Sequence, residues 1–128
     1  MPRKKSVTLT EVEQRFMEIL WERGNATVAE VLEALPDEYR VAFNTVQTTI
    51  RILEQKGYLR HESQGRGFRY YPVVAREEAS TSAVHNLLHR FFDGRPASLA
   101  INLLESEQLT PDELAHIERL VRQAKAEK

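Results

Sequence analysis

The sequence of 128 residues contains no cysteine, which excludes disulfide bonds and metal sites built from thiolates. It also lacks an apolar run of the roughly 20 residues that a membrane-spanning helix needs. The basic start is followed by polar and acidic residues, not by the apolar core of a signal peptide. We therefore expect no membrane insertion and a cytoplasmic protein, with one domain or a small domain plus an oligomerisation appendage.

A strong net charge is also absent, because 18 Lys and Arg stand against 19 Asp and Glu. Total charge therefore neither favours nor excludes a nucleic-acid partner. Basic residues do gather in two stretches, a flexible basic arm at residues 1–9 and a segment between residues 40 and 70. These basic residues are Arg3, Lys4 and Lys5 in the arm and Arg40, Arg51, Lys56, Arg60, Arg66 and Arg69 in the segment.

Catalytic motifs are missing as well: there is no Gly-x-Ser-x-Gly and no glycine-rich nucleotide loop. Residues 65–67 read Gly-Arg-Gly, but they connect two predicted strands and no helix follows them. His85 and His89 have an i, i+4 spacing that can ligate zinc, with His116 or a glutamate as a third ligand. Without a His-Glu-x-x-His pattern, two solvated histidines are the favoured interpretation. We expect no enzyme, no cofactor and no metal.

The most informative stretch is 44–55, which we predict to be a helix. Asn44 is a good N-cap, and Gln47 follows three residues later as in a capping box. Val46, Ile50 and Leu53 fall on one face. The other side has amides, hydroxyls and one cation, which suit base edges in the major groove of DNA. The alternative is an ordinary solvated face. The candidate DNA-binding residues of this helix are Asn44, Thr45, Gln47, Thr48, Arg51 and Gln55.

The surrounding elements favour DNA binding. Capping boxes at Thr10 and Thr27 open helices that run to about residues 23 and 35. Residues 25–26 can form an edge strand, and residues 58–63 and 68–72 form a predicted hairpin around a glycine-rich turn. Three helices followed by a basic hairpin indicate a winged helix-turn-helix over residues 10–73. We expect phosphate contacts from the basic arm and from the wing residues Arg60, Arg66 and Arg69. A winged helix that binds protein or RNA remains an alternative.

Residues 74–128 are predicted to be three amphipathic helices, the last opened by a capping box at Thr110. They are too few to close a good core alone, so a two-fold copy of the chain is expected to cover them. Met17 and Trp21, four residues apart on the first helix, are interpreted as core or as a docking surface for this second half. The predicted dimerisation residues are Val84, Leu87, Leu88, Phe91, Leu103, Leu114, Ile117, Leu120 and Val121. The fold class is thus mainly α with a small β-hairpin wing.

Several segments resemble the penicillinase-repressor (BlaI/MecI) family of winged-helix transcriptional repressors. They are residues 9–13 (LTEVE), 19–21 (ILW), 44–48 (NTVQT), 56–59 (KGYL), 67–73 (GFRYYPV) and 98–105 (SLAINLLE). The resemblance implies a homodimeric repressor on a palindromic operator, connected with antibiotic resistance. It also implies relief of repression by cleavage in the tail, triggered by a membrane sensor protease. Asn102 matches the family's cleavage segment, whereas Leu103 stands where better-known members have Phe. A sister branch senses copper through Cys-x-Cys motifs, and this mode does not carry over.

Overall fold

The computed structural model describes residues 8–127, so the basic arm residues Arg3, Lys4 and Lys5 lie outside the described residues. Contacts divide the chain into two compact units after Leu87, and each unit is described by itself. The elements are α1 Glu11–Arg23, β1 Ala26–Thr27, α2 Val28–Ala34, a 3-10 helix η1 Asp37–Tyr39, α3 Phe43–Gln55, β2 Leu59–Gln64, β3 Gly67–Pro72, α4 Arg76–Phe91, α5 Pro96–Ser106 and α6 Pro111–Ala126.

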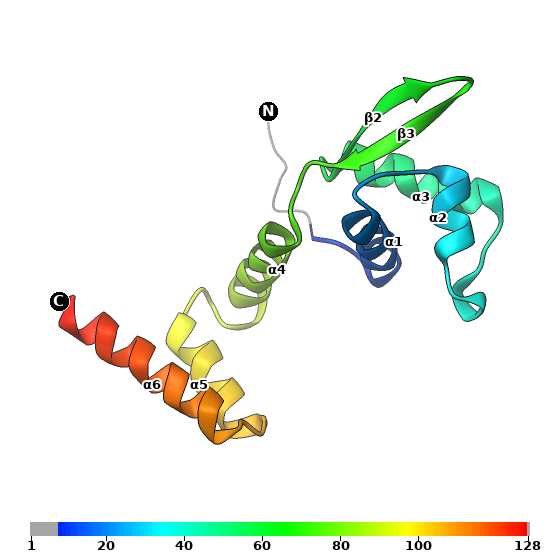
Figure 1. The fold of residues 1–128 in the computed structure, drawn as a ribbon. Coiled ribbons are helices and arrows are strands. Elements are labelled where there is room, and N and C mark those ends of the chain that lie inside the picture. The colour runs from blue at the N-terminus through cyan, green and yellow to red at the C-terminus, as the bar shows by residue number, and fades with distance from the viewer. Residues whose placement is uncertain (1–7, 128) are drawn as a thin grey trace. The chain divides into compact units, whose positions relative to one another are not determined.

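The first unit is a winged helix (Figure 1). The helices α1, α2 and α3 pack around one apolar core, and the hairpin of β2 and β3 extends from them as the wing. The strand order is β1-β3-β2 and both pairings are antiparallel. The core side chains are Phe16, Met17, Leu20, Ala26, Val28, Val31, Leu35, Val46, Ile50, Leu53, Tyr58, Leu59 and Tyr70.

Local sequence signals account for the helix ends. The side chains of Thr10, Thr27 and Thr110 each accept a hydrogen bond from the backbone N–H three residues on. The glutamate at that position accepts one from the threonine's own N–H, so these three predicted capping boxes are confirmed. The helix α3 ends in a turn where Gly57 has a φ of 92°. The N–H of Tyr58 there donates to the carbonyl of Leu53, as in a Schellman motif.

The predicted N-cap at Asn44 is wrong. α3 begins at Phe43, and Ala42 is its N-cap without any side-chain hydrogen bond. The carbonyl of Ala42 accepts from the N–H groups of Thr45 and Val46, so the helical ladder starts two residues before Asn44. This frees the Asn44 side chain from capping and places it within the first turn.

The start of α4 belongs to the first unit. Val74 and Ala79 pack on the edge of the winged-helix core. The indole Nε1 of Trp21 donates to the carbonyl of Val74 at 2.8 Å, and Arg76 pairs with Glu18 on α1. The division after Leu87 therefore falls inside α4, later than the predicted boundary at residues 73–74.

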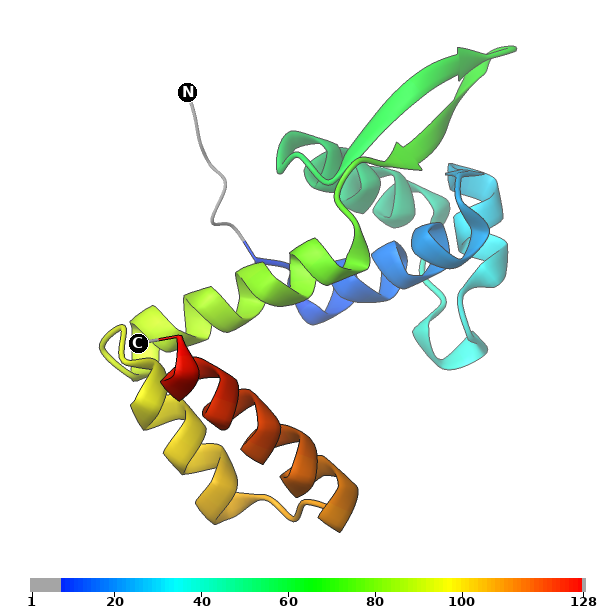
Figure 2. The same ribbon diagram turned by 60° about the vertical axis from the view of Figure 1, so that its left-hand side comes forward.

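The second unit contains the end of α4 together with α5 and α6. The helices α5 and α6 are joined through residues 107–110 (Figure 2). None of the three helices α4, α5 and α6 has a buried residue in the described part of the chain. Asp93 and Gly94, with φ values of 55° and 72°, make the sharp turn between α4 and α5.

Candidate nucleic-acid interface

The outer face of α3 is polar and open to solvent. Asn44, Thr48, Arg51 and Gln55 are all exposed, and their spacing of i, i+4, i+7 and i+11 sets them in one row along the helix. Gln47 lies half-buried beside this row. The opposite side is fixed in the core by Val46, Ile50 and Leu53, which are fully buried. The helix therefore holds the row at a defined orientation, as groove reading requires.

Thr45 differs from the rest of the predicted set. It is exposed, but helical geometry places it on the flank of α3, about a quarter turn from the row. Its carbonyl accepts a hydrogen bond from the Thr49 hydroxyl at 2.9 Å. The predicted reading residues thus form a row with Gln47 on one flank and Thr45 on the other.

Most basic residues between positions 40 and 70 already have acidic partners. Lys56 Nζ lies 2.6 Å from Glu13, and Arg60 lies 2.7 Å from Glu62. Arg69 binds Glu30, and Arg40 lies 3.8 Å from Asp37. The exceptions are Arg51 and Arg66, which have no acidic partner within ion-pair distance among residues 8–127. The unneutralised positive charge of this segment therefore lies on α3 and at the tip of the wing.

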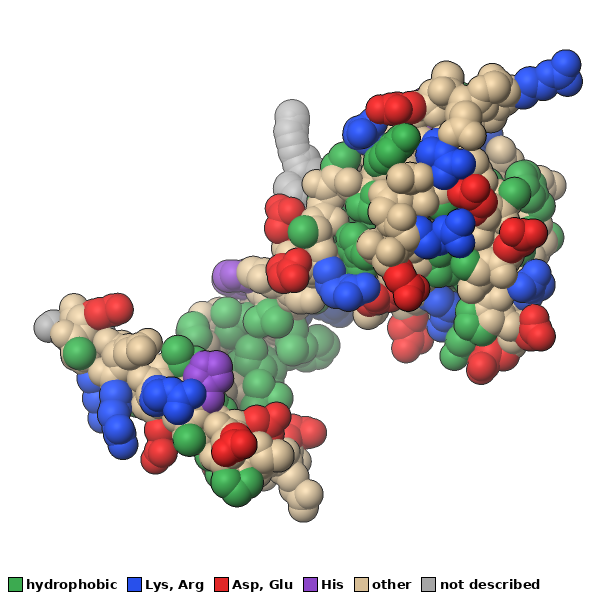
Figure 3. All heavy atoms as spheres, viewed as in Figure 1, with side chains coloured by type: hydrophobic (Ala, Val, Ile, Leu, Met, Phe, Trp, Pro, Cys, Tyr) green, Lys and Arg blue, Asp and Glu red, His purple; other side chains and the backbone are tan. Residues whose placement is uncertain are grey.

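The two faces of the wing differ in character. On one face His61 lies 2.6 Å from Glu54 of α3, and its ring contacts those of Phe68 and Tyr70. This contact ties β2 to the last turn of α3. On the other face, Arg60 lies over the ring of Tyr71 at 4.4 Å. The Gly65–Gly67 turn ends the hairpin with Arg66 exposed, and Figure 3 shows a basic side chain at that free end.

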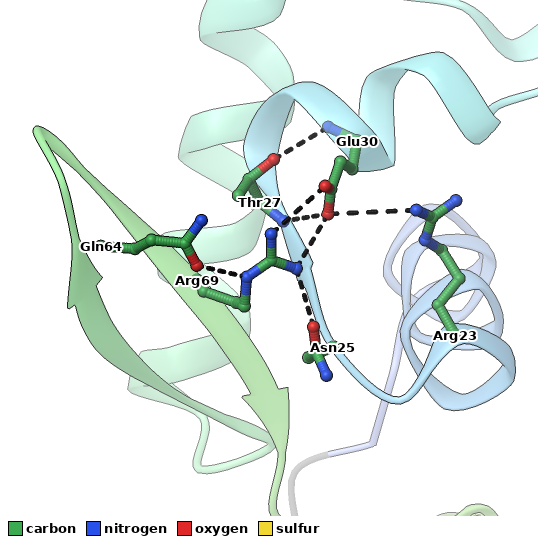
Figure 4. Close-up of polar contacts among 6 residues, drawn as sticks. All are labelled: Arg23, Asn25, Thr27, Glu30, Gln64 and Arg69. Atoms are coloured by element: carbon green, nitrogen blue, oxygen red, sulfur yellow. Dashed lines mark hydrogen bonds and ion pairs between the residues drawn. The ribbon is translucent and has the colours of Figure 1, made fainter.

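The side chain of Arg69, a predicted phosphate contact, is hydrogen-bonded within the winged helix. Its guanidinium donates to Asn25 Oδ1 at 2.7 Å and to both carboxylate oxygens of Glu30 at 3.0 and 3.3 Å (Figure 4). Its Nε donates to Gln64. The hydrogen bonds from Arg69, with the one from the backbone N–H of Thr27, hold the pKa of Glu30 below its usual value. Sequence spacing alone could not show this network, because its members lie far apart in the chain.

A groove of about 270 Å³ runs between the wing and the start of α3. Sequence reasoning missed Phe43 and Phe68, which line the groove and are both 45% exposed. Gln47, Gln64 and Arg66 add polar groups to the lining. The groove joins the two surfaces that carry unpaired cations.

The predicted dimerisation residues lie on α4, α5 and α6, and most remain exposed. The exposed fraction is 67% for Phe91 and 52% for Leu120, whereas Leu88 and Ile117 are half-buried. Asn102 and Leu103 are exposed in the middle of α5. His85 and His89 are exposed on α4, and residues 8–127 hold no cluster of three or more potential metal ligands. No helix in that range is long and apolar enough to cross a membrane.

A three-helix unit with a hairpin wing and a polar, solvent-facing third helix defines the winged helix-turn-helix class of nucleic-acid-binding proteins. The sequence model of the penicillinase repressor family matches residues 9–123. The chain belongs to this family, and is thus a DNA-binding transcriptional repressor rather than an enzyme.

Two relatives and one solved structure illustrate the similarity. The penicillinase repressor of Bacillus licheniformis is 28% identical over 125 residues, which cover 98% of each chain. The methicillin resistance regulatory protein MecI of Staphylococcus aureus is 24% identical over 91% of this chain and 95% of that protein. The solution structure of the DNA-binding domain of the repressor BlaI matches with a TM-score of 0.52 and 28% identity, over 59% of this chain and 93% of that domain.

Proposed function

We propose that the protein binds a palindromic operator as a homodimer, with α3 of each subunit in the major groove of one half-site and the wing against the neighbouring backbone. The observation that supports this proposal is which basic residues have acidic partners and which do not. Four of the six basic residues between positions 40 and 70 have acidic partners, whereas Arg51, in the exposed row of α3, has none among residues 8–127. An unpaired arginine among amides and hydroxyls is the arrangement that reads base edges.

Within this proposal, Arg51, Gln47 and Thr48 reach the bases. Arginine can donate two bonds to guanine, glutamine can pair with adenine, and the threonine methyl can contact thymine. Arg66 at the wing tip and the basic arm at residues 3–5 contact phosphates. Such contacts position the protein and carry no sequence information of their own.

Arg51→Ala tests the base-reading assignment. An operator is first selected from a random duplex library with the wild-type protein, and affinities for it and for random DNA are then compared. The variant should lose about 1–3 kcal/mol on the operator and relax specificity at one position of each half-site. Lys125→Ala, which removes an exposed charge from α6, is the control. Equal binding by wild type and Arg51→Ala would overturn the assignment, and tighter binding of duplex RNA than of DNA would favour the RNA-binding alternative.

The dimer is supported by the apolar side chains that α4, α5 and α6 leave uncovered, as Figure 3 also shows on these helices. A second copy of the chain supplies the same surface and can cover it by two-fold symmetry. Two reading helices then meet half-sites one helical turn or a multiple apart. Sedimentation at micromolar concentration should give a dimer, and a folded monomer there would contradict the proposal.

We further propose that cleavage between Asn102 and Leu103, through a membrane sensor protease pathway, relieves repression. Both residues are exposed, and a cut there would detach the second half of α5 together with α6. Each winged helix would then bind its half-site alone, and losing this linkage costs about 10²–10⁴ in apparent affinity.

A chain truncated after Asn102 tests the cleavage mechanism. It should be monomeric and should need far higher concentrations to occupy the operator. Full dimerisation and full operator occupancy by this fragment would exclude cleavage here as the switch.

The names of the two relatives refer to penicillinase and methicillin resistance, so we infer a cytoplasmic regulator of antibiotic-resistance genes.

A further inference from the structure

The base of the wing is attached to the helix-turn-helix through very little backbone. β1 pairs with β3 at only two positions, Ala26 with Tyr70 and Thr27 with Arg69. Beyond Arg69 toward the tip, β3 pairs among the described residues only with β2 of its own hairpin. Two residue pairs define a sheet edge but constrain the angle of a protruding hairpin poorly. On the β2 side, the His61–Glu54 contact and the buried Leu59 hold the base of the hairpin against the helices. A further interaction on the β3 side is needed if the tip is to meet a partner at a fixed place.

Arg69 supplies that interaction. Of the two β3 residues that pair with β1, it is the one nearer the tip, and its guanidinium bonds to residues of three separate segments. Asn25 precedes β1, Glu30 lies in the first turn of α2, and Gln64 ends β2. A planar guanidinium bonded on several edges has little freedom to rotate. The side chain of Arg69 is 21% exposed.

Glu30 is equally committed. Its Oε1 accepts from the Thr27 N–H that opens α2, at 3.1 Å, and both of its oxygens accept from Arg69. Arg23, at 4.0 Å, adds a more distant positive charge. The carboxylate that caps the first helix of the helix-turn-helix is thus also the anchor of the wing. For Arg69 to reach a phosphate, it would have to leave a charged partner behind.

We propose that Arg69, Glu30 and Asn25 form a clamp that sets the angle of the wing, so that Arg66 at its tip meets the DNA backbone while Arg69 makes no DNA contact. Arg69 and Glu30 are then positioning residues for DNA binding. The inference rests on the proposed function, since it concerns where the wing is held on DNA.

Glu30→Gln separates the clamp from a direct contact because the two predict opposite signs. Glutamine preserves the capping box but loses the ion pair. If Arg69 were a phosphate ligand, removing its competing acid would tighten DNA binding and steepen the salt dependence. If the clamp positions the wing, Glu30→Gln should bind DNA more weakly than the wild type, although it has lost a negative charge. Its salt slope should fall by about 0.9 for one lost phosphate contact, so that it loses roughly threefold less affinity than the wild type between 50 and 200 mM salt.

The matched controls are Glu33→Gln and Arg66→Ala in the full-length protein. Glu33 is an exposed acid on the same helix with no part in the clamp, and its variant should bind at least as well as the wild type. Arg66→Ala should lower the slope by the same amount as Glu30→Gln. In the Arg66→Ala background, Glu30→Gln should have no further effect on the slope, because the tip contact is already gone. A merely structural role for Glu30 would not produce this non-additivity.

Two outcomes overturn the clamp. One is DNA binding by Glu30→Gln that is tighter than, or equal to, that of the wild type. The other is a double variant, Glu30→Gln with Arg66→Ala, whose change in salt slope equals the sum of the two single changes. Urea unfolding first establishes that each variant is folded; if Glu30→Gln is not, Asn25→Ala removes one partner of Arg69 and should lower the slope in the same direction. A wild-type protein without salt-dependent affinity for duplex DNA would instead overturn the proposed function.

Discussion

The winged helix and the three helices that follow it treat their apolar side chains in opposite ways. α1, α2 and α3 bury Phe16, Leu20, Ile50 and their neighbours almost completely. By contrast, α4, α5 and α6 bury no residue in the described part of the chain, although they too carry apolar stripes. An apolar stripe predicts that a helix will pack, but not which chain supplies the other side. This difference is the basis of the proposed dimer.

The largest expected effect lies in the first of these regions. Phe16→Ala leaves a cavity in a core where Phe16 is 1% exposed, so the free energy of unfolding should fall by about 3–5 kcal/mol. Phe43→Ala makes the same change at a site that is 45% exposed and should cost less than about 0.5 kcal/mol. Urea unfolding at one protein concentration measures both. Similar losses for the two variants would mean that the core is not where the structure has it.

In the second region the same kind of change should act on assembly instead. Phe91 is 67% exposed, so in a monomer its truncation would cost almost nothing. In the proposed dimer, Phe91→Ala should raise the dissociation constant about 30-fold, which corresponds to roughly 2 kcal/mol for an interface anchor. A sedimentation series over protein concentration measures this, with Phe43→Ala as the matched control. Equal dissociation constants for the two variants would remove Phe91 from the interface.

A smaller effect is expected at the point where the winged helix holds the start of the tail. Trp21→Phe removes the indole N–H that donates to the Val74 carbonyl at 2.8 Å, at a cost of about 0.5–1.5 kcal/mol. The loss should appear in the urea unfolding of the winged helix and not in the dimer dissociation constant. An unchanged unfolding free energy would show that this bond makes no net contribution.

The smallest expected effect concerns the pH dependence of the winged helix. The Arg69 hydrogen bond and the Thr27 backbone lower the pKa of Glu30 below its usual 4.5. Because the folded-state pKa is lowered, the stabilisation is fully present above about pH 4.5 and is lost as pH falls through the folded value. The stability advantage of wild type over Glu30→Gln, followed by urea unfolding from pH 6 to pH 3, should therefore shrink on acidification. An advantage independent of pH would show that the carboxylate charge does not contribute.

The sequence predicted much of the fold because most of its signals are local. Thr10 and Glu13 lie within one helical turn, as do Thr110 and Glu113, so composition and spacing suffice to place these helix starts. The glycine-rich turn likewise predicted the hairpin. The N-cap was predicted wrongly because Asn44, the second residue of α3, gives the same sequence pattern as a capping residue, while the actual N-cap, Ala42, makes no side-chain hydrogen bond.

The candidate site was less accessible to sequence reasoning. The row on α3 follows from helical periodicity, and the structure has those residues exposed as expected. Which cations remain unpaired does not follow, because Glu30 and Arg69 are 39 residues apart and meet only through the pairing of β1 with β3. Basic composition therefore overstated the charge available to a partner. The roles in DNA contact remain predictions, which the Arg51 and Glu30 experiments test.

Glu13 has a consequence for the way this unit opens. Its carboxylate is 8% exposed; it caps the start of α1 and also receives Lys56 from the end of α3, at 2.6 Å. If either helix end frays, the ion pair breaks, and the charged partner on the other helix stays in a poorly hydrated site without its counter-charge. Amide hydrogens in the first turn of α1 and the last turn of α3 should therefore exchange with solvent in one cooperative event. Two segments more than forty residues apart would then share a single opening free energy.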